Sequence, residues 1–237
     1  MISLKNKYVL PDSCGVVSNA KVYGLSDAVR RSKYPMAVDV SALTDDITPG
    51  IESLAKSSPG SGHDHWLCGV CVQFDLSFSV KAWTELERYH FINFVSSQST
   101  MHRISKFDLS VPGAYSLYTD SRMIAIMQEL VSAYNEKEES VKRYEKNCME
   151  LCVDKEAGGI LKDLKRDAAD AYLRILYSNP CGFRLTAGMT TNYLQLKTIY
   201  AQRKNHRLPE WREFCAWVET LPCSYLITGK DRDDNGF

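Results

Sequence analysis

The sequence lacks any apolar run close to the about 20 residues that a membrane-spanning helix needs. It also lacks an excess of charge, because 29 Lys and Arg residues balance 29 Asp and Glu residues. A protein that binds nucleic acid irrespective of sequence needs a positive excess, so we expect neither nucleic acid nor a membrane as partner. The first residues, MISLKNKYVLPDS, contain no apolar segment followed by a cleavage site. We therefore expect a cytoplasmic protein.

Common signatures of nucleotide and hydrolase chemistry are also missing. The sequence contains no GxxxxGK[ST], no GxGxxG after a strand, no HExxH and no GxSxG. It has no HxE followed by a zinc-binding CxxC, the arrangement of nucleotide deaminases. These absences disfavour the common hydrolases, P-loop enzymes and Rossmann dehydrogenases.

Cysteine is well represented, with eight residues in a chain of 237. Without a secretion signal we expect reduced thiols rather than disulfides. Cys68 and Cys71 have the spacing of a metal pair, and His63 and His65 precede them. However, we predict an extended strand over residues 66–78, where residues three apart point to opposite faces. This favours buried apolar thiols over a zinc site, and no metal is expected.

Hydrophobic periodicity and turn residues divide the rest of the chain mainly into helices. Ser26 is the predicted cap of a short helix, Asp120 is the predicted cap of the longest one, and Gly158 with Gly159 should interrupt the pattern. The predicted helices cover about residues 27–33, 51–57, 80–96, 120–152, 160–177, 190–204 and 209–222. Many helices with few strands and no βαβ alternation indicate a mixed α/β (α+β) fold. We expect one domain over residues 1–228 and a polar tail over 229–237.

The helix predicted over 190–204 is the most informative stretch. Its sequence is TTNYLQLKTIYAQRKNH, and its polar stripe consists of Asn192, Gln195, Gln202, Arg203 and His206. Amide, guanidinium and imidazole groups can together bind carbonyls, ring nitrogens and phosphate. The alternative is a solvent-exposed face, although such faces usually carry Glu and Lys.

Two further segments carry candidate anion-binding groups. ERYHFINFVSSQSTMHR, residues 87–103, gathers basic and hydroxyl side chains where a predicted helix gives way to a loop. Such a place suits an anion, and a capped helix end is the alternative. Arg174 stands alone on an otherwise apolar helix face, where a structural ion pair is the alternative.

Taken in order, these segments resemble flavin-dependent thymidylate synthases, the ThyX family. That family has a Gly-His segment, an RHRxxSxNExSxR motif, an arginine before a Leu-Pro turn, and a helix that begins TxN. Here Gly62-His63, the 87–103 segment, LRILYSNP with Arg174, and the helix ending in Arg203 follow in that order. The RHR element corresponds either to residues 88–90 or to residues 89–91.

The resemblance implies a small twisted sheet flanked by several long helices, and a homotetramer whose subunits share active sites. It implies an enzyme that binds FAD, is reduced by NADPH, and uses methylene-tetrahydrofolate to methylate dUMP to dTMP. Two alternatives stay open. The same scaffold could act on another pyrimidine deoxynucleotide monophosphate, such as dCMP, by methyl or hydroxymethyl transfer. It could also be a non-catalytic nucleotide-binding or interaction protein.

The resemblance also implies roles for individual residues. Arg203 would contact the pyrimidine ring, and Ser99 would lie in the phosphate loop, so both are candidate catalytic residues. The implied substrate-binding residues are Gln98, Ser99, Arg103, Arg174 and Arg203. The implied cofactor-binding residues are His63, Arg88, His90, Asn192 and His206.

Overall fold

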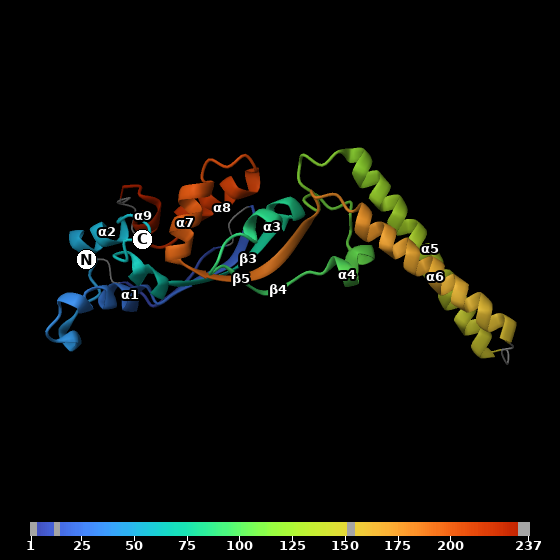
Figure 1. Ribbon diagram of the computed structural model, residues 1–237, viewed down its shortest axis with the longest axis horizontal. Coiled ribbons are helices and arrows are strands. Elements are labelled where there is room, and N and C mark those ends of the chain that lie inside the picture. Colours follow the sequence, from blue (N-terminus) through green and yellow to red (C-terminus); the bar gives the residue numbers. More distant parts are fainter. Residues whose placement is uncertain (1–3, 12–14, 151–154, 232–237) are drawn as a thin grey trace. The chain divides into compact units, whose positions relative to one another are not determined.

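A computed structural model, which describes residues 4–11, 15–150 and 155–231, confirms the mixed α+β fold. Its sheet has five strands in the order β1-β2-β3-β5-β4 (Figure 1). The strands are β1 (Lys7–Val9), β2 (Val17–Tyr23), β3 (Cys71–Ser79), β4 (Asn93–Ser97) and β5 (Arg184–Asn192). β1 with β2, β2 with β3, and β4 with β5 pair antiparallel. None of the described helices is long and apolar enough to cross a membrane.

The chain divides into two compact units. The first comprises Met1–Phe78, Ala82–Ser97 and Thr186–Phe237, and the second comprises Ser79–Lys81 and Gln98–Leu185. Helices α1 (Leu25–Ser32), α2 (Pro49–Ala55), α7 (Tyr193–Arg203), α8 (Pro209–Glu219) and α9 (Tyr225–Thr228) lie in the first unit. Each unit contains a hydrophobic cluster of its own.

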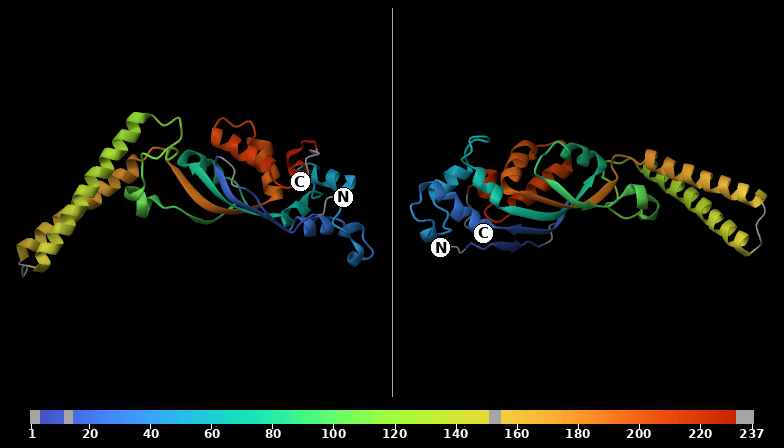
Figure 2. Two further views of the ribbon diagram at one scale, coloured as in Figure 1. Left: turned by 180° about the vertical axis from the view of Figure 1, so that it is seen from behind. Right: turned by 60° about the horizontal axis from the view of Figure 1, so that its bottom comes forward.

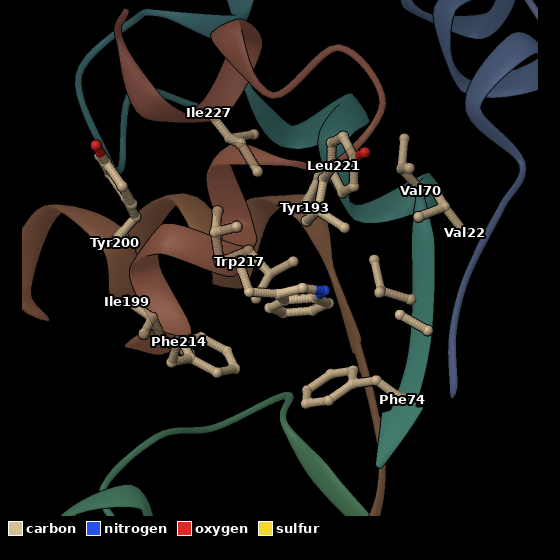
Figure 3. Close-up of a cluster of buried hydrophobic side chains, with 14 of the residues drawn as sticks. Val22, Val70, Phe74, Tyr193, Ile199, Tyr200, Phe214, Trp217, Leu221 and Ile227 are labelled. Atoms are coloured by element: carbon tan, nitrogen blue, oxygen red, sulfur yellow. The ribbon is translucent and has the colours of Figure 1, made fainter. Parts of the chain in front are cut away.

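The core of the first unit forms where α7 and α8 pack on the sheet. In β3 alternate residues are buried, because side chains alternate between the faces of a strand. The Phe74 ring lies with its centroid 4.8 Å from that of Trp217 on α8, and Phe214 lies 5.2 Å from Trp217 (Figure 3). From α7, Tyr193 and Leu196 complete this cluster.

The second unit is dominated by two long helices, α5 (Ser121–Glu150) and α6 (Lys155–Ser178). They run side by side as a hairpin (Figure 2), with the Tyr134 and Tyr172 ring centroids 4.9 Å apart. The predicted cap of α5 is confirmed, because the Asp120 carboxylate accepts the backbone N–H of Arg122 at 2.9 Å. Met127 and Ile175 are buried in the cluster at the base of the hairpin.

The predicted helix over 80–96 is wrong in its second half. The helix α3 (Val80–Leu86) ends early, Phe91 has a φ of 60°, and residues 93–97 form β4. Asn93 is paired with Thr190 of β5. Backbone pairing with another strand therefore overrides the local amphipathic pattern.

The prediction for the CGVC segment is also corrected. The strand begins at Cys71, whereas Cys68 lies in the 3-10 helix η3 (His65–Gly69), so the two residues are not on one strand. Cys71 is exposed and Cys68 half-buried, rather than both buried. The Cys68 sulfur lies 3.8 Å from His65 Nε2, but no group of three potential metal ligands gathers in the described part of the chain.

The six described cysteines are free thiols, and Cys14 and Cys152 lie outside the described residues. Of the tail predicted over 229–237, Lys230 forms an ion pair with Glu219 at 2.6 Å. Residues 232–237 lie outside the described part.

Three helix starts differ from the prediction. Gly24, with a φ of 77°, precedes α1, and the Ser26 hydroxyl donates to Asp45 at 2.6 Å instead of capping. Gly158 and Gly159 lie inside α6, although each glycine costs a helix about 1 kcal/mol. Residues 190–192 belong to β5, so α7 starts only at Tyr193.

Candidate functional site

Arg203, the last residue of α7, is held at the centre of a polar cluster in the first unit. Its Nε donates to the Tyr89 hydroxyl at 2.7 Å, and its Nη1 lies 3.2 Å from Glu85 Oε2. Nη1 also lies 2.7 Å from His206 Nε2. The Arg203 and Glu85 side chains are 12% and 17% exposed, so this ion pair is largely shielded from water. The rigid fork of the guanidinium is thereby fixed in direction.

Aromatic rings flank the same guanidinium. Its central carbon lies 5.3 Å from the Tyr89 ring centroid and 4.9 Å from that of Trp211 on α8, distances typical of cation–π contacts. The Tyr89 hydroxyl donates in turn to Gln202 at 2.9 Å. Arg203 Nη2 has no partner within the described parts of the chain. An oriented N–H donor of this kind can form a hydrogen bond to a carbonyl oxygen of a ligand.

The structure brings only part of the predicted polar stripe together. Gln202, Arg203 and His206 meet in this cluster, and His206 lies just after the end of α7 rather than on it. Its backbone N–H donates to the Arg203 carbonyl at 2.9 Å, which turns the ring back toward the helix. Asn192 caps the opposite end of α7, where its side-chain oxygen accepts the backbone N–H of Gln195 at 2.9 Å. The stripe is therefore split between the two ends of the helix.

The other predicted cofactor-binding residues of the first unit lie in turns. Arg88 and His90 flank Tyr89 between α3 and β4, and His63 lies in the turn before η3. All three side chains are exposed, and none contacts a partner among the residues that the structure describes. A guanidinium and two imidazoles without internal partners are suitable groups for phosphate oxygens. Arg88 and His90 share one turn, and His63 lies in a separate one.

The predicted phosphate-loop residues lie in the second unit. Gln98 follows β4, Ser99 precedes the short helix α4 (Thr100–Arg103), and the Ser99 carbonyl accepts the Arg103 N–H at 3.2 Å. Tyr172 of α6 donates its hydroxyl toward two carbonyls of α4, at 3.1 and 3.3 Å. This contact holds α4 against the helix that carries Arg174.

Arg174 lies on the exposed side of α6. It lines a pocket of about 270 Å³ together with residues of α5. It has no ion-pair partner among the described residues, so the structural ion pair that was the alternative is not formed there.

Sequence reasoning missed three residues that hold Arg203. Glu85, Tyr89 and Trp211 lie on three different segments, and nothing in their local sequence points to a common partner. The one available signal was general: a half-buried arginine needs a carboxylate, and Glu85 lies on a predicted amphipathic helix. Its identification required the packing of α3 against the end of α7.

Comparison with solved structures identifies the fold. The chain is similar to the flavin-dependent thymidylate synthase ThyX from Helicobacter pylori complexed with FAD and dUMP, with a TM-score of 0.50 and 12% identity. That alignment covers 87% of this chain and 94% of the other. A second structure of Helicobacter pylori ThyX with FAD and dUMP gives a TM-score of 0.51 and 13% identity over 88% and 95% of the two chains.

The chain has a ThyX-like fold. Neither a protein-family model nor a curated protein sequence matches it. Sequence identities of 12 and 13% support a shared fold only. The ThyX-like fold therefore explains the order of the elements, and the roles of single residues have to be tested by experiment.

Proposed function

We propose that this chain is a flavin-dependent, thymidylate synthase-like enzyme that methylates dUMP. The overall reaction consumes dUMP, methylene-tetrahydrofolate, NADPH and a proton, and yields dTMP, tetrahydrofolate and NADP⁺. One observation carries the proposal: a ThyX-like fold over nearly the whole chain bears the four family-like segments in the family's order. Bound FAD supplies the hydride transfer that this reaction needs.

Arg203 is the residue that we propose to polarise the pyrimidine. Its guanidinium is held by Glu85 and Tyr89, and its Nη2 remains available. A donor fixed before the reaction begins stabilises negative charge on a ring carbonyl without reorganisation at the moment of reaction. Glu85 is a positioning residue in this proposal, because it contacts Arg203 and not the nucleotide.

Other polar side chains would bind the nucleotide phosphate and the cofactor. We propose that Gln98, Ser99 and Arg103 bind the phosphate, and that Arg174 faces the nucleotide. The cofactor-binding groups proposed for FAD are His63, Arg88, His90, Asn192 and His206. A homotetramer would supply these groups to each active site from more than one copy of the chain.

The first experiment is an absorbance spectrum of the purified protein with added FAD, followed by titration with dUMP. We expect flavin bands near about 370 and 450 nm that stay with the protein and shift when dUMP binds. No FAD retained at micromolar concentration would contradict the redox proposal. Nucleotide binding without FAD would then indicate the non-catalytic alternative, and turnover with dCMP alone would indicate a different substrate.

A variant series tests the proposed roles. Arg203→Lys keeps the charge but loses the fork, so we expect kcat to fall by about 100-fold while FAD remains bound. Arg88→Ala should weaken FAD binding. It should leave the free energy of unfolding of the protein without dUMP unchanged. Lys56→Ala, a cation in another exposed position of the first unit, is the matched control. Equal effects of Arg88→Ala and Lys56→Ala on FAD binding would contradict the assignment of Arg88.

A further inference from the structure

The CGVC segment, residues 68–71, places two accessible thiols in the first unit. Cys71 is exposed and begins β3, and Cys68 is half-buried at the end of η3. The proposed reaction gives neither cysteine a role. No third metal ligand gathers with them in the described part of the chain. Two accessible thiols three positions apart can instead be joined in a disulfide, provided that the backbone brings them close.

The backbone of this segment turns in a way that brings the two cysteines close. Gly69 is the last residue of η3, and Val70 is extended, with φ −96° and ψ 94°. A helical residue followed by an extended one forms the centre of a type VIII turn, whose first and fourth Cα atoms lie within about 7 Å. Disulfides usually span a Cα separation of about 4.4–6.8 Å. Rotation of the Cys68 and Cys71 side chains can therefore join the two sulfurs with little movement of the backbone.

Packing on two sides holds this turn in place. A Cβ atom added to Gly24 would lie 2.8 Å from the Gly69 carbonyl oxygen, and one added to Gly69 would lie 3.3 Å from the Ala28 Cβ, so α1 fits closely against the turn. The Val70 carbonyl accepts the backbone N–H of Tyr193 at the start of α7, at 3.0 Å. A turn fixed in this way keeps the two thiols near each other, which favours ring closure within the chain.

His65 provides a proton acceptor for one of the two thiols. Its Nε2 lies 3.8 Å from the Cys68 sulfur, and the residue is exposed. Only the thiolate form of a cysteine attacks a disulfide, and a neighbouring imidazole can take the thiol proton. This contact identifies Cys68 as the attacking thiol and leaves Cys71 as the thiol that completes the disulfide.

We propose that Cys68 and Cys71 form a reversible thiol–disulfide site that reacts with small-molecule disulfides such as glutathione disulfide. The Cys68 thiolate attacks one sulfur of the reagent, whose S–S bond breaks, and the leaving thiolate takes the proton from His65. Cys71 then attacks the Cys68 sulfur of the resulting mixed disulfide and expels the second thiolate, which takes the Cys71 proton. The two cysteines are oxidised to one disulfide, and the reagent is reduced to two thiols. An excess of thiol reverses both steps.

The inference goes beyond the proposed methylation of dUMP and does not depend on it. Disulfides in reducing compartments are usually transient and serve redox sensing or catalysis, so a reversible pair agrees with the free thiols of the described cysteines. A chain that binds no FAD but closes the disulfide would reject the reaction alone. A chain that binds FAD and dUMP but never closes the disulfide would reject this inference alone.

Trypsin gives the test a direct readout. Cleavage after Lys56 and Lys81 releases residues 57–81 as one peptide, in which Cys68 and Cys71 are the only cysteines. The full chain is incubated with glutathione disulfide, alkylated after denaturation and digested without reductant. Mass spectrometry should find this peptide unalkylated and lighter by two hydrogen atoms, and dithiothreitol added before alkylation should restore two alkylated cysteines. A peptide alkylated at both cysteines after exposure to glutathione disulfide overturns the proposal.

Single substitutions test the order of the two steps. Cys71→Ser should stop at the mixed disulfide and retain one glutathione on Cys68. In that background, His65→Ala should slow the appearance of the mixed disulfide by at least about tenfold, because the proton acceptor is removed. His102→Ala, at an exposed histidine of α4, is the matched control and should leave the rate unchanged. Equal rates for the two histidine variants would contradict the role of His65.

Cys181→Ser controls for reaction at an exposed cysteine outside the pair. This variant should close the disulfide between Cys68 and Cys71 like wild type. Circular dichroism should show equal helix content in all variants, which excludes misfolding as the cause of a changed rate. A disulfide that disappears in Cys181→Ser would show that Cys68 and Cys71 are not each other's partners and would overturn the proposal.

Discussion

Lys197 on α7 shows how a single residue can join distant segments of the first unit. Its ammonium group donates to Asp64 at 2.6 Å and to the carbonyls of Ala55 and Ser57 at 2.7 Å each. The Lys197 and Asp64 side chains are 12% and 4% exposed. These three acceptors lie more than 130 positions before Lys197 in the chain. The ion pair therefore stabilises the first unit through contacts between segments that are distant in sequence.

We expect Lys197→Met to lower the free energy of unfolding by about 3–5 kcal/mol. The substitution keeps the length of the side chain but leaves the Asp64 carboxylate buried and unpaired. Urea denaturation followed by circular dichroism measures the loss. Lys204→Met, at an exposed position of the same helical region, should change stability by less than about 1 kcal/mol. Similar losses for both variants would contradict a specific role of the buried pair.

We expect Cys215 on α8 to make the stability of the chain depend on pH in the alkaline range. Burial, with the nearby Glu219 carboxylate, raises the pKa of the Cys215 thiol from 9.0 to about 12. In the unfolded chain the thiol ionises near pH 9, whereas the folded chain retains the proton. The stabilisation is therefore complete below pH 9 and is lost as pH rises from 9 toward 12.

Denaturation measured at pH 8, 9 and 10 checks this expectation. The free energy of unfolding should fall between pH 9 and 10, and Cys215→Ala should fall less steeply than wild type over that interval. The buried Tyr115, whose pKa is raised by burial to about 12, adds to the decline at still higher pH. An identical slope for the variant would show that Cys215 does not carry the effect.

At the scale of elements, substitutions of Asn192 can distinguish a structural role, the capping of α7, from a functional role in binding FAD. The Asn192 side-chain oxygen caps α7 by accepting the Gln195 N–H, and we propose that the same residue contacts the flavin. Asn192→Ala should cost about 1 kcal/mol of stability, because one helix donor loses its acceptor. Asn192→Asp keeps an acceptor at the cap and should be nearly as stable as wild type.

The two variants together decide what Asn192 does. If it contacts FAD, Asn192→Asp should be stable but should bind FAD more weakly, because it replaces an amide donor by a negative charge. FAD titration followed by flavin fluorescence, alongside thermal denaturation, gives both quantities. Unchanged FAD affinity in Asn192→Asp would leave Asn192 with the capping role only.

Element types were predictable where one local signal dominated. The long helix after Asp120 and the helix opened by Pro209 follow from periodicity and caps, and both are confirmed. β4 and β5 were missed, because residues 93–97 and 184–192 form strands only through pairing with other parts of the chain. For the same reason the 87–103 segment became turn, strand and helix in succession.

At the scale of the whole molecule, the chain has two separate hydrophobic clusters. A cavity made in one cluster should raise hydrogen exchange mainly in the unit that contains it. Ile175 is fully buried in the cluster of the second unit, and Ile199 is fully buried in that of the first. Ile175→Ala and Ile199→Ala should each cost about 2–5 kcal/mol by leaving a cavity. Hydrogen exchange should rise mainly within residues 98–185 for the first variant.

Ile199→Ala is the reciprocal control, because its effect should be confined to the first unit. The measurement is amide exchange followed by mass spectrometry under native conditions. If both variants raise exchange equally across the described residues, the two units unfold as one cooperative body and the prediction is wrong.

The sequence by itself determined the fold class, the main helices and the order of four segments that resemble ThyX, because these follow from local periodicity and motif spacing. The candidate site followed only in part: Arg203 and His206 were predicted and do meet, while Glu85 and Tyr89 were not predicted. Tertiary structure alone decided which carboxylate holds Arg203, where the edge strand β4 forms, and that Cys68 and Cys71 lie on different elements. These outcomes depend on burial and pairing between distant segments, which no local pattern contains.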